Sequence, residues 1–192
     1  MNYQDYIWDL GGTLLDNYET STAAFVHTLQ DFGLTASHDE VYKALKVSTE
    51  YAVRQFAPRN KEFLKVYKAN EAKELEHPIL FDGASELLAQ IIQQGGRNFL
   101  ISHRDDQVLE ILQKTQIGLY FTEVVTATNG FKRKPDPESM LYLKDKYQIE
   151  SGLVIGDRPI DIEAGQAAGF SCYLFDNMNN LEEFVDIELE KE

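Results

Sequence analysis

The stretch Tyr6–Asp16 (YIWDLGGTLLD) decides the fold that this chain is predicted to adopt. Residues 6–8 are β-formers and indicate a short buried strand. Asp9 stands where that strand should end, and the Gly11-Gly12 pair favours a turn. A carboxylate at the carboxyl end of a buried strand, with the Thr13 hydroxyl nearby, lies in the crevice where open α/β sheets bind ligands. Asp9 is therefore a candidate nucleophile or metal ligand; the alternative is a turn aspartate that caps the next segment.

The composition of the 192 residues is that of an ordinary globular protein, long enough for one domain or one domain with an insertion. The net charge of −14 argues against nucleic acid or an anionic membrane as the main partner. No apolar run approaches the ~20 residues of a membrane span, and the first five residues lack the features of a signal peptide. Cys172 is the single cysteine, which excludes an internal disulfide and fits a reducing compartment. We therefore expect a cytoplasmic location, and the sequence leaves the oligomeric state open.

Residues 16–78 are predicted to form a compact α-helical unit. The first helix carries apolar residues at helical spacing, including Phe25 and Leu29, and Gly33 offers its end. Residues 37–40 (SHDE) have capping-box spacing and open a second helix. A third is expected near residues 49–57 and a fourth near residues 61–76. Because nothing in this region reads as a strand, it is predicted to be an insertion after the first strand.

From residue 79 onward the pattern alternates between strands and helices. The expected strands are residues 99–102, 123–126, 153–156 and 171–175, with helical patterns between them. Such alternation is typical of a parallel sheet covered by helices on both faces. The predicted fold is therefore α/β: a Rossmann-like, doubly wound parallel sheet of about five strands, formed by residues 1–15 and 79–192. The last eleven residues hold six acids and one lysine and are expected to be solvated or frayed.

Polar residues follow the predicted strands: Asp9, then Ser102 with His103 and Arg104, then Lys134, then Asp157 with Asp161. The carboxyl ends of parallel strands share one edge, so these side chains should converge on one crevice. Clustered acids repel one another unless a cation lies between them, and hard oxygen ligands favour Mg²⁺. A phosphoryl group beside that ion would use Ser102 as a hydrogen-bond donor and Lys134 as a counter-charge. Structural interpretations stay open for Ser102 as a helix cap, Lys134 as a solvated charge and Asp161 as a first-turn helix acid.

Taken together, these motifs resemble those of the haloacid dehalogenase-like hydrolase superfamily, in the phosphoglycolate phosphatase-like branch with a helical cap inserted after the first motif. The matching positions are Asp9 and Thr13 in the first motif, Ser102 in the second, Lys134 within residues 134–137 (KPDP) in the third, and Gly156-Asp157 with Asp161 in the fourth. Four short motifs in the correct order form a specific signal, although no single one would. On this resemblance, residues 16–78 are the cap.

The resemblance implies a Mg²⁺-dependent hydrolase that acts on a small phosphorylated metabolite. Asp9 would attack phosphorus and form an aspartyl-phosphate, which divides hydrolysis into two steps. Mg²⁺ would be held by Asp9, the backbone carbonyl of Gly11 and Asp157, while Asp161 would steady the ion's water shell or Lys134. Phosphoryl oxygens would be bound by Ser102 and Lys134. The remaining candidates for supporting or substrate-contacting positions are Thr13, His103 and Arg104.

Gly11 departs from the family pattern. Phosphatases of this superfamily usually carry a second aspartate at that position, which serves as general acid and base. Glycine keeps its backbone carbonyl for the metal but cannot transfer a proton, and loss of a positioned acid costs ~10²–10⁴-fold in rate. Asp16, His103 or a residue of the cap remains as a substitute source of the proton. Two alternatives follow: a catalytically impaired protein that binds a phosphorylated metabolite, and a carbon–phosphorus bond hydrolase that uses a cap lysine.

Overall fold

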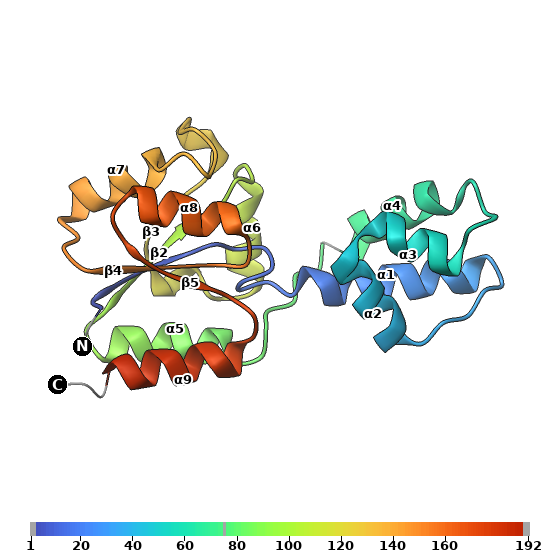
Figure 1. The fold of residues 1–192 in the computed structure, drawn as a ribbon, viewed down its shortest axis with the longest axis horizontal. Coiled ribbons are helices and arrows are strands. Elements are labelled where there is room, and N and C mark those ends of the chain that lie inside the picture. Colours follow the sequence, from blue (N-terminus) through green and yellow to red (C-terminus); the bar gives the residue numbers. More distant parts are fainter. Residues whose placement is uncertain (1–2, 75, 190–192) are drawn as a thin grey trace. The chain divides into compact units, whose positions relative to one another are not determined.

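The computed structural model describes residues 3–74 and 76–189 (Figure 1). The chain divides into two compact units. The first runs up to Leu15 and resumes at Leu80, and the second is Asp16–Ile79. Among the described residues, the first unit contains two clusters of buried hydrophobic side chains and the second contains one.

The first unit is built on a five-stranded parallel sheet, which confirms the predicted α/β fold. The strands are β1 (Asp5–Trp8), β2 (Arg97–Ile101), β3 (Phe121–Val125), β4 (Gly152–Gly156) and β5 (Ser171–Leu174). Their spatial order is β3-β2-β1-β4-β5, so β1 is the central strand. Trp8 lies opposite Leu100 of β2 and Ile155 of β4. This register brings the carboxyl ends of three neighbouring strands to the same edge of the sheet.

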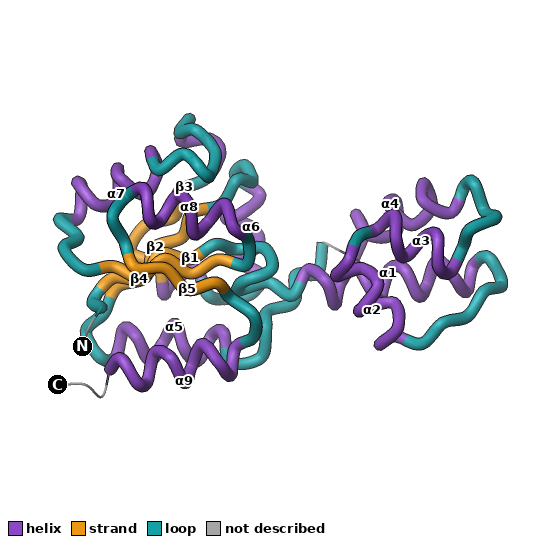
Figure 2. Tube along the Cα trace, viewed as in Figure 1, coloured by secondary structure: helices purple, strands orange, loops and turns teal. Residues whose placement is uncertain are grey.

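Helices cover both faces of the sheet, as Figures 1 and 2 show for α5 and α9 on one side and α7 and α8 on the other. The helices of this unit are α5 (Ala84–Gln93), α6 (Gln107–Lys114), α7 (Glu138–Tyr147), α8 (Pro159–Ala167) and α9 (Met178–Leu189). Two 3₁₀ segments, η1 (Gly118–Tyr120) and η2 (Ala127–Asn129), flank β3. Tyr6 and Trp8 pack with residues of α5, α6 and α9, whereas Ile7 packs with residues of α7 and α8. The alternation of side chains along β1 therefore supplies both cores of a doubly wound sheet.

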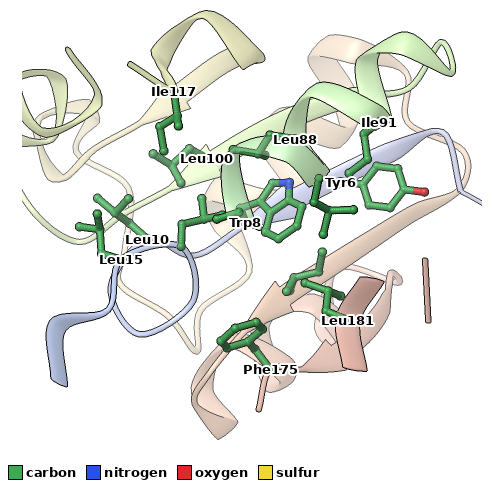
Figure 3. Close-up of a cluster of buried hydrophobic side chains, with 14 of the residues drawn as sticks. Tyr6, Trp8, Leu10, Leu15, Leu88, Ile91, Leu100, Ile117, Phe175 and Leu181 are labelled. Carbon is green, nitrogen blue, oxygen red and sulfur yellow. The ribbon is translucent and has the colours of Figure 1, made fainter. Parts of the chain in front are cut away.

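Trp8 lies within the larger of these two cores (Figure 3). Its indole Nε1 donates a hydrogen bond of 2.9 Å to Oδ1 of Asn98 on β2. The Asn98 amide nitrogen in turn donates to the backbone carbonyl of Leu88 on α5 at 3.0 Å. Buried polar groups destabilise a fold unless they are paired, and here the pairing joins β1, β2 and α5. The residue immediately before Asp9 is thereby held firmly.

The second unit consists of helices α1 (Asn17–Asp31), α2 (His38–Val47), α3 (Thr49–Phe56) and α4 (Phe63–Glu74). The capping box expected at residues 37–40 is confirmed, with Ser37 and Glu40 bonded reciprocally. The core of the unit is aromatic: the ring of Phe25 lies 4.9 Å, between centroids, from both Phe63 and Tyr67. All three side chains are fully buried. Every regular element described in residues 16–79 is a helix, as the sequence predicts.

The end of the chain differs from the prediction. Residues 182–192 were expected to be solvated or frayed, but residues 182–189 belong to α9. Leu181 and Val185, at i and i+4, are fully buried against the sheet, so a helical apolar stripe is present among the acids. Residues 190–192 lie outside the described part of the chain. None of the helices described in the structure combines the length and the apolar character needed to cross a membrane.

Candidate active site

Three residues of the candidate site directly follow neighbouring strands. Asp9 follows β1, Ser102 follows β2 and Asp157 follows β4. The backbone N–H of Asp9 donates to the carbonyl of Ile155 at 2.9 Å, which carries the ladder with β4 past the end of β1. The N–H of Ser102 donates to Val125 at the end of β3. Sheet pairing therefore fixes the backbone on which these polar side chains stand.

The turn after Asp9 makes room for Asp157. Gly12 adopts φ +84°, and a Cβ at this position would lie 2.7 Å from Cγ of Asp157. Only glycine tolerates both this φ and this close approach. Gly11 is not among the glycines with positive φ in the described chain. The neighbouring Thr13 is fully buried, and its hydroxyl has no hydrogen-bond partner among the described residues.

Asp9, Asp157 and Asp161 form an acidic cluster. Each of them offers a carboxylate oxygen, and these oxygens lie within 4.8 Å of one another. Oδ1 of Asp157 is buried and has no hydrogen-bond partner within residues 3–74 and 76–189. Burial, followed by repulsion from Asp9 and Asp161, raises the pKa of Asp157 to about 6. Unpaired hard oxygens surrounded by negative charge match the ligand preference of a cation such as Mg²⁺.

Lys134 links two members of this cluster. Its side chain is almost completely buried, and Nζ lies 2.5 Å from Oδ1 of Asp9 and 2.5 Å from Oδ1 of Asp161. The other oxygen of Asp161 accepts a hydrogen bond from the N–H of Arg158 at 3.1 Å. Asp161 therefore supports Lys134, and Asp157 is the member of the cluster with most freedom to bind a cation. Burial raises the pKa of Asp9, while the charge of Lys134 opposes that rise.

The segment after β2 carries three further sequence candidates. The Ser102 hydroxyl accepts from the N–H of Arg104 at 3.2 Å within a local turn, and it does not cap α6, whose N-cap residue is Asp106. Nε2 of His103 accepts from the backbone N–H of Lys134 at 3.0 Å. Among the residues described, no hydrogen bond or ion pair joins the side chains of Thr13, Ser102 or Arg104 to the acidic cluster.

The two named substitutes for a general acid differ in their surroundings: burial raises the pKa of Asp16, whereas that of His103 is lowered. Burial, followed by the charges of Lys134, Arg133 and Arg158, lowers the pKa of His103 to about 4. Its ring therefore carries no extra proton at neutral pH. Asp16 is the N-cap of α1, and its Oδ1 accepts from the N–H of Glu19 at 3.0 Å.

The sequence reasoning did not single out Arg158. This arginine stands at the N-cap of α8, between Asp157 and Asp161, and its charge partly opposes the rise in the pKa of Asp9 and of Asp157 that burial causes. It is the nearest counter-charge in sequence to the acidic cluster. A basic residue directly after the aspartate of the fourth motif was the available signal.

Comparison with known proteins identifies the family. The sequence model of the family described as haloacid dehalogenase-like hydrolase matches residues 6–175. This range holds all four motifs and spans most of the chain. The chain therefore belongs to the haloacid dehalogenase-like hydrolase family, which confirms the resemblance of its motifs.

Individual relatives agree with this assignment. A phosphoglycolate phosphatase from Aliivibrio fischeri is 29% identical over 88% of this chain and 81% of that protein. The pyrophosphatase PpaX from Oceanobacillus iheyensis is 26% identical over 88% of this chain and 81% of that protein. A crystal structure of a hydrolase from Streptococcus pneumoniae TIGR4 is 69% identical, with a TM-score of 0.92, and covers 97% of this chain and 100% of that one.

Proposed function

We propose that this protein is a Mg²⁺-dependent phosphatase that hydrolyses a small phosphorylated metabolite through an aspartyl-phosphate on Asp9. The observation that carries the proposal is the position of Asp9, whose carboxylate contacts the Lys134 ammonium and has an oxygen within 4.8 Å of one of Asp157. A nucleophile close to both a buried cation and a candidate metal-binding oxygen suits the attack on an anionic phosphoryl group. The names of two relatives, a phosphoglycolate phosphatase and a pyrophosphatase, support a substrate of this class.

The proposed reaction has two displacements at phosphorus. In the first, a carboxylate oxygen of Asp9 forms a bond to phosphorus and the bond to the leaving-group oxygen breaks. In the second, water attacks the phosphorus of the aspartyl-phosphate, which releases inorganic phosphate and restores the carboxylate. Lys134 would hold a phosphoryl oxygen throughout, with Ser102 as a second donor. Asp161, which forms an ion pair with Lys134 and accepts a hydrogen bond from the backbone of Arg158, would keep the ammonium in place.

The residues that would hold Mg²⁺ are Asp9, Asp157 and the backbone carbonyl of Gly11. The unpaired, buried oxygen of Asp157 supports this assignment. The bound ion would supply positive charge to the oxygens of the phosphoryl group. Gly11 offers no side chain for proton transfer, so we propose that turnover is slow for leaving groups that need a proton. The relatives are named as enzymes, so binding without turnover and carbon–phosphorus cleavage are not favoured.

The proposal is tested by measuring the phosphate released from a metabolite panel that includes phosphoglycolate and pyrophosphate, with and without Mg²⁺. We expect release that depends on Mg²⁺, and a loss of about 10³-fold or more in Asp9→Asn because the nucleophile is removed. Asp39→Asn is the matched control, since that side chain is 87% exposed on α2. Turnover by Asp9→Asn at the wild-type rate would exclude Asp9 as the nucleophile.

A further inference from the structure

The loop that carries Lys134 is held by a side chain from another part of the chain. Residues 130–137 contain no regular helix or strand, so the backbone N–H of Lys134 has no partner from secondary structure. That N–H donates to Nε2 of His103 at 3.0 Å, across 31 residues of sequence. His103 is half-buried and immediately follows Ser102. One imidazole therefore joins the loop after β2 to the loop before α7.

We propose that His103 is a positioning residue, which fixes the backbone of Lys134 so that its ammonium group points at Asp9 and at the phosphoryl group. This inference rests on the proposed phosphatase function and deepens it. Lys134 Nζ lies 2.5 Å from both Asp9 and Asp161, so a small displacement of its backbone would break both contacts. Because His103 directly follows Ser102 in the chain and accepts a hydrogen bond from the backbone of Lys134, it restrains the separation of these two proposed phosphoryl-binding residues.

The chemistry of the position favours an uncharged acceptor. A carboxylate at residue 103 would accept the same hydrogen bond, but it would add negative charge beside the phosphoryl site and compete with Asp9 for Lys134. An imidazole accepts only while neutral. The cations around it, Lys134, Arg133 and Arg158, together with burial, keep it so, because they lower its pKa to about 4. With Nε2 as the acceptor, the ring proton must be on Nδ1.

The first test compares His103→Leu with His103→Gln, in steady-state hydrolysis of p-nitrophenyl phosphate with Mg²⁺. Leucine fills space but leaves the N–H of Lys134 unpaired, so kcat/KM should fall about tenfold or more. Glutamine places a neutral acceptor at about the reach of Nε2, so it should restore activity to within about threefold of wild type. His27→Leu is the matched control, since that imidazole is 60% exposed on α1. Equal losses in His103→Leu and His103→Gln, or no loss in either, would overturn the proposal.

A second test asks whether His103 acts through Lys134. The affinity for inorganic phosphate with Mg²⁺ is measured by titration in wild type, His103→Leu, Lys134→Ala and the double variant. If His103 works by placing the ammonium group, His103→Leu weakens phosphate binding about tenfold in the wild-type background and less than about twofold when Lys134 is already alanine. Equal, additive losses in both backgrounds would contradict the inference. Thermal unfolding of each variant separates this effect from loss of the fold.

A spectroscopic test needs neither turnover nor a ligand. In ¹⁵N-histidine-labelled protein at neutral pH, His103 should be the neutral tautomer protonated at Nδ1, whereas a ring protonated at Nε2 would refute the hydrogen bond to Lys134. This measurement also separates the two hypotheses. A wild-type protein that neither hydrolyses phosphate esters nor binds phosphate would end the proposed function, and the tautomer would still decide whether His103 holds Lys134. Turnover in wild type with unchanged turnover in His103→Leu would end the positioning role alone.

Discussion

Of the two adjacent glycines, Gly12 occupies a position that requires glycine and Gly11 does not. Gly12 combines positive φ with close approach to Asp157, so any side chain there would displace the carboxylate of Asp157, the proposed metal ligand. Gly11 has no such φ, and its backbone does not require glycine. An aspartate at residue 11 is therefore compatible with this backbone conformation.

Gly11→Asp should accelerate hydrolysis of alkyl phosphates by about 10²–10⁴-fold, because an acid would be restored next to the nucleophile. In wild type, the rate should depend steeply on the pKa of the leaving group across a series of aryl phosphates. The variant should show a much weaker dependence. Gly11→Asn has nearly the same shape but no transferable proton, so it should behave as wild type. An asparagine variant as fast as the aspartate variant would show that proton transfer is not the cause.

The pKa of Asp157 predicts how stability depends on pH and Mg²⁺. In the metal-free protein this pKa is raised to about 6 from 3.8, so the ionised carboxylate is disfavoured by folding. The protonated carboxyl of Asp157 therefore makes its full contribution to the free energy of unfolding below about pH 4. This contribution is lost as the pH rises through about 6. Mg²⁺ binds the ionised form, so its stabilising effect should be larger near pH 7.5 than near pH 5.

Thermal unfolding with and without MgCl₂ at the two pH values measures this effect. Asp157→Asn should remove the Mg²⁺-dependent rise in Tm and leave the metal-free Tm near pH 7.5 unchanged or higher. Glu163→Gln, an exposed change on α8, should retain the full response to Mg²⁺. A Tm of Asp157→Asn that still rises with Mg²⁺ would place the metal elsewhere.

At the scale of the element, α9 is part of the core and not a tail. Leu181 is fully buried against the sheet, and its truncation leaves a cavity. Leu181→Ala should lower the free energy of unfolding by about 2–5 kcal/mol, measured in urea, with little change in kcat for the folded enzyme. Asn179→Ala on an exposed position of α9 should change it by less than about 0.5 kcal/mol. Equal effects of the two substitutions would mean that α9 does not close the core.

The sequence predicts the strands better than α9 for a physical reason. Each of the three inner strands, β1, β2 and β4, contains a short apolar run, is followed by a polar residue and is almost wholly buried. In α9 acidic residues stand between the buried Leu181 and Val185. The excess of acids therefore suggests a solvated end, although the apolar residues have helical spacing. The candidate site likewise has a part that the sequence predicts and a part that it does not. Strand ends indicate where Asp9, Ser102 and Asp157 stand, whereas the bond between His103 and Lys134 depends on the path of two irregular loops, which no local pattern encodes.

At the scale of the whole molecule, the helical unit has a separate aromatic core. Phe25 is fully buried and its ring lies 4.9 Å from those of Phe63 and Tyr67. Phe25→Ala should destabilise this unit by about 3–5 kcal/mol. Hydrogen exchange should then quicken in residues 16–79 while the amides of β1 and β4 stay protected. Val47→Ala, at a position 67% exposed in the same unit, is the control and should leave hydrogen exchange unchanged. Faster exchange throughout the sheet in Phe25→Ala would show that the two units unfold together.

The central place of β1 sets an order of events during synthesis. Asp9 is synthesised before either partner of its strand, because β1 pairs with β2 and β4, which begin at Arg97 and Gly152. In a nascent chain β1 therefore stays unpaired until Arg97 has emerged, and Asp9 and Asp157 can come together only after Gly152 has followed. Helices α1 to α4 need no residue beyond their own segment and can form earlier. The residues of the proposed site thus come together only after the helical unit and strands β1 to β3 have been synthesised.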